Sequence, residues 1–390
     1  MALLLEKHTR PAVWEASREY FSALAIYLAS RVVIYLAIQF SMDYVPRNPD
    51  GGEAFWDAGS FWYDRLLRWD SGWYLSIITH GYHYDGNDAV QQTVNFAPLY
   101  PLAAWLVSLI PTLAAPEAML IVSGVSAVAA VLLFYKLVKN QFGDNVGLTA
   151  VAFLSFFPTS FFLSAGYAES LTLLLMVACF LLLERGALLW AAAVAGLALA
   201  ARPTGIVLLP VLWWAIWQNH RHDVTRMLIY LATVTLLATS GLWLFSIYQW
   251  AEFGYPFGFF TNRGAFLDRQ VGSGLIDALM LKPFRHLHLG LQPRKAELLF
   301  FVTGFACIIA ACRRLPFSYT LFGISALLLP YLSYASFYAM PRFALLAFPA
   351  FIGAALLCEG RTWLTGCLLA LSATLLFWYT ALFSQWYWVA

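Results

Sequence analysis

The sequence predicts an all-α protein that crosses a membrane many times. Of its 390 residues, 61% are hydrophobic and only 11% are charged, whereas about a quarter of a soluble globular domain is charged. The mean hydropathy is +0.70. Apolar stretches of roughly 20 residues, the length that spans a ~30 Å hydrocarbon core, recur along the whole chain. This composition is typical of a polytopic membrane protein, and the net charge of +2 points to no particular partner.

About eleven apolar stretches are candidate membrane-spanning helices, within a single transmembrane domain that covers residues 1–390. The first stretch follows a polar segment and precedes no small-residue cleavage site, so we expect a retained signal anchor. The stretches cover approximately residues 21–40, 117–137, 146–164, 168–184, 187–201, 204–218, 227–250, 297–312, 315–335, 343–358 and 362–383.

One further apolar stretch, "FAPLYPLAAWLVSLIP" at residues 96–111, is short for a span and contains three prolines. Irregular backbone at membrane depth is stable only where protein covers it or where it lines a cavity, so we expect a re-entrant or interfacial helix here. With this stretch confined to one side, six basic groups share the side that the positive-inside rule assigns to the cytoplasm. They are Lys7 with Arg10 and Arg18, Lys136 with Lys139, Arg185, Arg221 with Arg226, Arg313 with Arg314, and Arg361.

Two long segments, residues 41–116 and 251–296, then face the extracytoplasmic side. The part of the first loop before the re-entrant stretch, residues 41–95, carries eight acidic residues against three arginines. Its stretch "FWYDRLLRWDSGWYLSIITHGY" interleaves charges with Trp and Tyr, which is typical of amphipathic helices at the membrane interface. The first loop is therefore predicted to lie where a lipid headgroup meets a polar substrate.

No nucleotide-binding or metal-binding motif is present: there is no Walker loop, no Rossmann glycine fingerprint and no H-E-x-x-H. His286 and His288 form an H-x-H pair without a nearby third ligand. The five cysteines lie mostly within apolar runs, and we interpret them as small buried residues. We therefore expect no cofactor, no metal and no nucleic-acid partner. The energy for any reaction would arrive in the substrate, as in an activated lipid.

Asp70 is the most interesting carboxylate, because it lies beside Trp69, Trp73 and Tyr74 at the predicted membrane edge. A partly desolvated carboxylate suits a general base that accepts a proton from a hydroxyl. An aspartate that precedes a helix also suits an N-cap, in which its side chain satisfies free backbone N–H groups. Both interpretations stay open, and they are compatible.

Three charged residues lie at or inside apolar stretches. Glu169 stands at the outer start of a span, where an acid also complements the helix dipole. Arg202 interrupts a long apolar stretch, and Pro203 would break the helix there. Arg31 lies inside the first span. A cation within the membrane costs about 2.5–3.5 kcal/mol and needs a partner, so pairing of Arg31 or Arg202 with a loop carboxylate is the structural alternative to a functional role.

Further polar residues lie at the predicted outer face. Arg342, in "YAMPRFALLAFP", opens a span, and its guanidinium suits either a bidentate grip on a lipid phosphate or an interfacial anchor. Asn262 and Arg263, in "YPFGFFTNRGAF", are either substrate contacts or parts of the loop structure.

Five motifs, taken in order from about residue 68 to 350, resemble those of one family. The stretch "RWDSGWYLSIITHGY" resembles the W-D-x-x-W/F-Y-x-x-I-A-x-x-G-Y signature of PIG-V-type mannosyltransferases, members of the GT-C glycosyltransferase superfamily. "NFAPLYPL" resembles their F-F-P-L-Y-P element, and "FFPTSFFLSAGYAESL" resembles F-P-x-S-F-F-x-S-x-x-Y-T-E-S-L, with Ala168 where the family often has Thr. "LAARPTGIVL" and "MPRFALLAFP" resemble the T-R-P/S-N/T-G and P-R-Y/F elements.

The resemblance implies a multi-spanning GT-C enzyme that uses a sugar carried on a polyprenyl phosphate, with an extracytoplasmic active site. It implies that a carboxylate of the first external loop, here Asp70, is the catalytic base. The expected donor is polyprenyl-phosphate-mannose, and the expected acceptor is a hydroxyl of a lipid-linked molecule or a glycan, in contact with membrane lipids. The compact length favours a prokaryotic plasma membrane over the endoplasmic reticulum.

The expected reaction inverts the anomeric configuration, and a guanidinium stabilises the leaving phosphate. Arg342 is the first candidate for this role, ahead of Arg202 and Arg263. Substrate contacts are also expected from a polar and aromatic set: Glu169, His80, Trp73, Tyr74, Tyr82 and Asn262.

Three alternatives stay open. The first keeps the transferase and changes the donor to another polyprenyl-linked sugar. The second is a transporter or flippase, although such proteins usually show inverted internal repeats, and none is visible here. The third is a non-catalytic subunit of a larger membrane complex.

Overall fold

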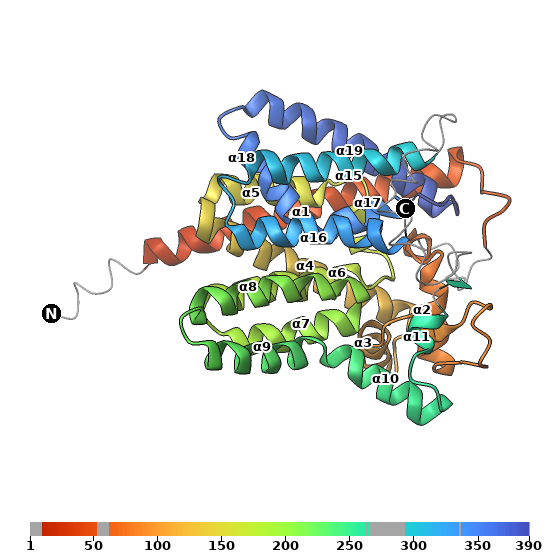
Figure 1. The fold of residues 1–390 in the computed structure, drawn as a ribbon. Helices are drawn as coiled ribbons and strands as arrows, with labels where there is room; N and C mark the ends of the chain where they lie inside the picture. Colours follow the sequence, from red (N-terminus) through yellow and green to blue (C-terminus); the bar gives the residue numbers. More distant parts are fainter. Residues whose placement is uncertain (1–9, 53–61, 263, 266–292, 335–336, 390) are drawn as a thin grey trace.

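The structure is a computed structural model, and it describes residues 10–52, 62–262, 264–265, 293–334 and 337–389. Within these ranges the regular secondary structure is entirely helical, which confirms the predicted all-α class. The long helices run side by side in a bundle (Figure 1). The amino terminus leaves one end of this bundle, and the carboxyl terminus lies at the other end (Figure 1).

The helices follow one another in this order. The first part of the chain forms α1 (Arg10–Tyr44), η1 (Trp62–Leu66), α2 (Asp70–His80), η2 (Thr93–Asn95), α3 (Leu99–Ser108), α4 (Ala115–Phe142), α5 (Asp144–Ser155), η3 (Ser160–Leu163) and α6 (Glu169–Glu184). The second part forms α7 (Leu188–Ala201), η4 (Pro203–Val207), α8 (Leu208–His220), α9 (Val224–Ala238), α10 (Ser240–Phe253), α11 (Gly258–Thr261), α15 (Pro293–Ala311), α16 (Phe317–Tyr334), α17 (Met340–Leu346), α18 (Pro349–Leu357) and α19 (Thr362–Ser384).

Four of the predicted spans are not single continuous α-helices. The stretch 146–164 is divided between α5 and η3, and the stretch 204–218 is divided between η4 and α8. The other two are divided by bends. The stretch 227–250 is divided between α9 and α10, which meet at a 52° bend. The hydroxyl of Thr239, at this break, donates to the Thr235 carbonyl oxygen at 2.7 Å, a contact that bends helices. The stretch 343–358 is divided between α17 and α18, which are bent by 79°. Pro349 begins α18, and its ring and missing N–H prevent α17 from continuing through it.

The apolar helices mark the chain as an integral membrane protein. By length and composition, three described helices are able to cross a membrane, namely Glu19–Tyr44 within α1, α4 and α19. The number reaches five when each bent pair counts as one span. Other helices of the bundle, such as α7 and α16, are apolar but shorter. The count of about eleven spans therefore stays a prediction.

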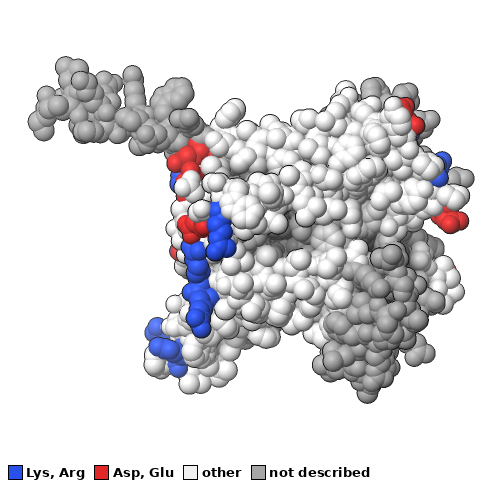
Figure 2. Space-filling model, turned by 90° about the horizontal axis from the view of Figure 1, so that it is seen from above, with Lys and Arg blue, Asp and Glu red and all other residues white. Residues whose placement is uncertain are grey.

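The two ends of the bundle differ in charge and in structure. Figure 2 shows Lys and Arg gathered at the end where the amino terminus leaves. The connections from α8 to α9 and from α18 to α19 turn at this end (Figure 1), and they carry Arg221 and Arg361. The opposite end carries the short helices α2, α3 and α11 (Figure 1). The stretch predicted to be re-entrant forms the ten-residue helix α3.

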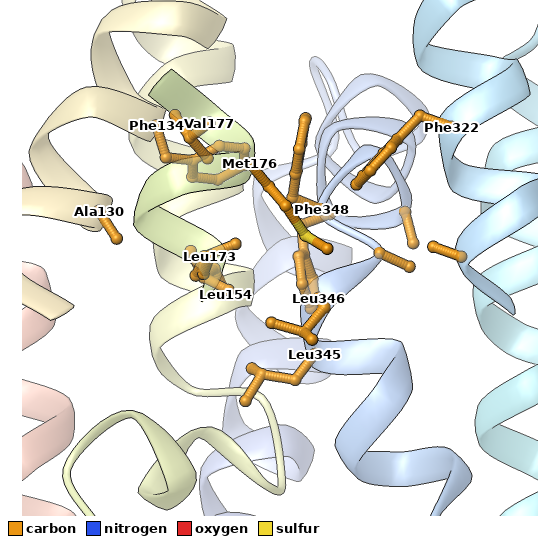
Figure 3. Packing of buried hydrophobic residues seen from close by; sticks show 14 of the residues in the cluster. Ala130, Phe134, Leu154, Leu173, Met176, Val177, Phe322, Leu345, Leu346 and Phe348 are labelled. Carbon is orange, nitrogen blue, oxygen red and sulfur yellow. The ribbon is translucent and has the colours of Figure 1, made fainter. Parts of the chain in front are cut away.

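The core that positions α17 is apolar and aromatic. Figure 3 shows Phe348, in the link between α17 and α18, among side chains of α4, α6 and α16. The ring centroid of Phe348 lies 4.9 Å from that of Phe322, 5.1 Å from Phe180 and 5.8 Å from Phe134. All four side chains are buried. Because the bend is packed on several sides, the short helix α17 is held at a fixed place in the bundle.

Candidate functional site

Four charged residues from four separate elements meet at the end of the bundle that carries α2. Arg342 on α17 donates from Nη1 to Asp70 Oδ2 at 2.6 Å. The Nε of Arg342 donates to Glu169 Oε1, and Nη1 of Arg202 donates to the same oxygen. The two carboxylates and two guanidiniums, called the charge quartet below, carry no net charge together.

The local sequence places each member of the quartet at a helix end. Asp70 and Glu169 begin α2 and α6, where a negative charge is stabilised by the helix dipole. Arg202 follows the last residue of α7, and its extended backbone, with φ −159° and ψ 138°, turns the chain into Pro203. The predicted helix break at Arg202 is therefore confirmed, and the break turns the guanidinium toward Glu169.

The quartet is layered in depth. The side chain of Glu169 is fully buried, those of Arg342 and Arg202 are 7% and 10% exposed, and that of Asp70 is 25% exposed. Glu169 therefore holds both guanidiniums from the protein side, and Asp70 is the member that water and ligands reach most easily. Arg202 pairs with a helix-terminal carboxylate rather than with a loop carboxylate, which corrects that part of the expectation.

Aromatic rings support the guanidinium of Arg342. Its Cζ atom lies 4.6 Å from the centroid of the Tyr167 ring and 5.3 Å from that of Phe162. A cation over a desolvated ring is attracted by the ring quadrupole. Arg342 is thus fixed by Glu169, by Asp70 and by two rings, and it has little freedom to leave the site.

A pocket of about 180 Å³ opens beside the quartet. Asp70, Arg202 and Arg342 contribute to its wall, which also contains rings and amide groups from distant parts of the chain. The further side chains that matter most are Tyr74, Asn95, Phe96, Phe259, Tyr338 and Trp388. The pocket combines two cations, one accessible carboxylate and several ring faces. Such a site suits an anionic ligand with an apolar or sugar portion.

The N-cap interpretation of Asp70 is wrong. Helix α2 begins at Asp70 itself, the capping position belongs to Trp69, and no side-chain cap bond is present there. The carboxylate of Asp70 binds Arg342 instead. The second interpretation, a reactive carboxylate in a partly covered site, is the one that the geometry allows.

The other predicted residues of the first loop fall into three groups. Tyr74 lines the pocket, and burial, together with the nearby charge of Glu169, raises the pKa of its phenol, so that it stays neutral. Trp73 stacks on Phe96 at 5.8 Å, and the Tyr82 hydroxyl donates to the Phe96 carbonyl oxygen at 3.0 Å. These two residues support the pocket wall from behind. His80 is exposed and bonds to Thr79, so the structure does not bring it to the pocket.

Asn262, the described candidate of the second loop, does not line the pocket. Asn262 is buried, its Oδ1 accepts from the Gln92 N–H at 3.1 Å, and its Nδ2 donates to the Val90 carbonyl oxygen at 2.6 Å. It therefore ties the segment after α11 to the first loop. Arg263, His286 and His288 lie outside the described residues.

Arg31 is satisfied without a carboxylate among its observed partners, contrary to one expectation. Its two Nη atoms donate to the carbonyl oxygens of Ser155 and Ser160 at 3.0 and 2.9 Å. They also bind the hydroxyls of Ser160 and Ser164, each at 2.9 Å. Arg31 thus ties α1 to the turn around η3 and lies apart from the pocket lining.

Several residues that line the pocket are not among those predicted from the sequence. Trp388 and Tyr338 line the pocket, and their rings stack at a centroid distance of 5.4 Å. Both lie in stretches rich in Tyr and Trp in the last sixth of the chain, and this aromatic enrichment is the sequence feature that could have indicated them as pocket residues. Within the described ranges, no three His, Cys, Asp or Glu side chains gather as a possible metal site.

Comparisons with known proteins give partial matches. Residues 97–245 match the sequence model of a family described as dolichyl-phosphate-mannose-protein mannosyltransferase. The match includes Glu169 and Arg202, and it excludes Asp70 and Arg342. No curated protein matches the chain significantly.

Two solved structures resemble the fold, both of the oligosaccharyltransferase of Archaeoglobus fulgidus. One, tethered to an acceptor peptide containing the NVT sequon, has 12% sequence identity and a TM-score of 0.46, and the match covers 92% of this chain and 55% of that chain. The apo form has 13% identity and a TM-score of 0.45, with the same coverage. The chain thus spans about half the length of the protein that it resembles (55%).

Proposed function

We propose that this protein is an inverting GT-C glycosyltransferase that uses a sugar carried on a polyprenyl phosphate. The observation that carries the proposal is the pairing of Asp70 with Arg342 in a pocket that also contains Arg202. An accessible carboxylate beside two buried guanidiniums supplies a base and an anion site within one small volume. The family match at residues 97–245 supports mannose as the transferred sugar.

The active site faces the extracytoplasmic side in this proposal. Asp70, which lines the pocket, begins α2. Helix α2 lies at the end of the bundle opposite the Lys- and Arg-rich end (Figures 1 and 2). Positive residues concentrate on the cytoplasmic side of membrane proteins. A prokaryotic plasma membrane is the proposed location.

Binding of the donor rearranges the quartet. The donor phosphate reaches Nη1 of Arg342 by displacing Asp70, the most exposed member, while Glu169 keeps its bonds to Arg342 and Arg202. Displacement frees the Asp70 carboxylate, whose Oδ2 accepts from the guanidinium in the unliganded protein. The base becomes available only when the donor is in place, which limits loss of the activated sugar to water.

Transfer is then a single displacement. The acceptor hydroxyl attacks the anomeric carbon from the face opposite the phosphate, and Asp70 takes the hydroxyl proton. The bond from the anomeric carbon to the phosphate oxygen breaks, and its electron pair leaves with the polyprenyl phosphate. Arg342 and Arg202 stabilise the charge that develops on this oxygen. The configuration inverts because no covalent sugar–protein intermediate forms.

The acceptor is proposed to be a hydroxyl of a lipid-linked molecule or a glycan. The description of the matched family names a protein acceptor, so a protein hydroxyl is the second candidate. Incubation of the purified protein in nanodiscs with polyprenyl-phosphate-mannose, and with its glucose and arabinose counterparts, tests the function. Mass spectrometry should show free polyprenyl phosphate together with a glycosylated lipid, glycan or peptide. A protein that moves the intact donor between leaflets without cleaving it is a flippase instead.

A further inference from the structure

The residue before Asp70 has a strained backbone. Trp69 has φ 53° and ψ −113°, a region that residues other than glycine adopt only where the surrounding structure holds them. The carbonyl group of Arg68 and the N–H group of Asp70 stand directly on either side of this residue. Whatever holds these two groups therefore sets the direction in which the Asp70 side chain leaves the backbone.

One hydroxyl binds both groups. The Tyr167 Oη donates to the Arg68 carbonyl oxygen at 2.9 Å and accepts from the Asp70 N–H at 3.2 Å. The Tyr167 side chain is fully buried, so water does not offer a replacement for either bond. The hydroxyl thus bridges the strained residue from its preceding carbonyl to its following amide.

The ring of the same tyrosine supports the partner of Asp70. The guanidinium carbon of Arg342 lies 4.6 Å from the Tyr167 ring centroid. The ring therefore supports Arg342, and the hydroxyl holds the backbone of Asp70. Both members of the ion pair between Asp70 and Arg342 are therefore held by one rigid, buried side chain.

Neighbouring contacts keep the two segments together. The Gly166 N–H donates to the Leu66 carbonyl oxygen at 3.2 Å, and the Ser71 hydroxyl donates to the Gly166 carbonyl oxygen at 3.1 Å. A Cβ atom at Gly166 would lie 2.5 Å from Leu67 Cδ2 and 3.0 Å from Met119 Cε, so a larger residue at this position would require these side chains to shift. The segment that precedes α6 therefore lies against the turn that precedes α2, and Tyr167 is held at that contact.

We infer that Tyr167 is a positioning residue for the reaction. Its hydroxyl holds the strained turn at Trp69 so that the Asp70 carboxylate faces Arg342 and the pocket, and its ring fixes Arg342 for the donor phosphate. Tyr167 does not line the pocket and touches no substrate in this account. The inference rests on the proposed function for its kinetic test, but its structural test does not.

The kinetic test compares two buried tyrosines. Tyr167→Phe removes the bridging hydroxyl and keeps the ring under Arg342. Tyr100→Phe is the matched control, because the Tyr100 hydroxyl is equally buried and also makes two hydrogen bonds, to Met119 O and Ser123 Oγ, each at 3.0 Å. We expect Tyr167→Phe to lower kcat by roughly 10- to 100-fold, with the donor KM and the thermal stability close to those of Tyr100→Phe. Equal kcat values in the two variants would overturn the inference.

A second variant tests the role of the strain. Glycine adopts positive φ without a steric penalty, so Trp69→Gly should keep Asp70 in place with less help from the hydroxyl. The loss of kcat caused by Tyr167→Phe should therefore be smaller in the Trp69→Gly background than in the wild type. A loss of the same size in both backgrounds would show that the hydroxyl does not act through the Trp69 turn.

The structural test needs no substrate. A high-resolution structure of Tyr167→Phe should show a negative φ at residue 69 and a broken bond between Asp70 and Arg342. An unchanged turn and an intact bond would overturn the inference, whatever the activity. By contrast, a wild-type protein that cleaves no polyprenyl-linked sugar would contradict the proposed function and leave this structural test decisive.

Discussion

Asp70 and Arg342 stand 272 positions apart in the chain, yet a 2.6 Å hydrogen bond joins them at the wall of the pocket. The side chain of Asp70 is 25% exposed and that of Arg342 is 7% exposed. Behind them the fully buried Glu169 binds Arg342 and Arg202 through one oxygen atom. In the proposed mechanism the phosphate displaces the outer carboxylate, and the inner carboxylate keeps its bonds. We therefore expect an anion that enters the pocket to compete with Asp70 for Arg342.

Asp70→Asn should bind polyprenyl monophosphate, the product of transfer, more tightly than the wild type. The substitution removes the negative charge that occupies Nη1 of Arg342, so the phosphate no longer displaces an ion pair. A charge-assisted hydrogen bond contributes about 1.5–3 kcal/mol, which corresponds to roughly a tenfold or larger gain in affinity. Isothermal titration calorimetry of polyprenyl monophosphate with each protein in nanodiscs shows whether the affinity rises or falls. Weaker binding would mean that Asp70 and the phosphate do not share Arg342.

Arg342→Lys should lower transfer by about 10²- to 10³-fold, because a guanidinium that stabilises the leaving phosphate is replaced by a point charge. An ammonium cannot bind Glu169 and a phosphate through separate, rigidly spaced N–H groups. Initial rates with polyprenyl-phosphate-mannose measure the effect. Arg314→Lys, in an exposed pair with Glu359 whose atoms lie 2.5 Å apart, is the control and should keep the wild-type rate. Full activity of Arg342→Lys would remove Arg342 from the mechanism.

Glu169→Gln should destabilise the fold as well as the site. The substitution leaves two largely buried guanidiniums without their shared counter-ion, and breaking a buried ion pair in this way costs about 3–5 kcal/mol. Thermal unfolding in detergent should show a clear decrease in Tm. Glu359→Gln, at about half exposure, should leave Tm nearly unchanged, since exposed ion pairs contribute about 0–1 kcal/mol. Similar Tm values for the two variants would mean that Glu169 does not stabilise the quartet.

Arg31→Met should reduce stability and leave donor binding intact. The side chain holds the turn around η3 through the carbonyl oxygens of Ser155 and Ser160, with four hydrogen bonds to these residues and Ser164. Without the guanidinium, the buried oxygen atoms that accept its hydrogen bonds have fewer partners, which costs about 1–3 kcal/mol of folding stability. Tm should fall while the donor KM of the folded fraction stays at the wild-type value. A large change in KM at unchanged Tm would assign Arg31 to the donor site instead.

The sequence predicts the helical architecture well, because apolar length is a local property. It places α4, α6 and α19 within a few residues, and it anticipates the short helix α3 from its prolines. It misses the bends after Ala238 and Leu346, since apolar composition continues through both. Thr239 and Pro349 interrupt the helices by local bonding and ring geometry, which hydropathy does not register.

The site is predicted only in part for a similar reason. Asp70, Glu169, Arg202 and Arg342 stand out individually, because charges are rare in this chain. These four residues pair because four helix ends pack together, and their positions in the sequence do not predict that packing. His80 and Asn262 satisfy the same criterion of a polar residue in an outer loop, but they face Thr79 and Gln92. The positioning role inferred for Tyr167 depends on the strained backbone of Trp69, and the sequence does not show that strain.

The most direct test of the central claim is the rate of sugar transfer from polyprenyl-phosphate-mannose by Asp70→Asn beside Asp43→Asn and the wild type. Asp43, near the end of α1, is an exposed acid and serves as the matched control. If Asp70 is the base, its amide variant should lose roughly a hundredfold or more of the wild-type rate, while Asp43→Asn keeps it. An Asp70→Asn protein that transfers mannose as fast as the wild type would contradict the account and place the base elsewhere.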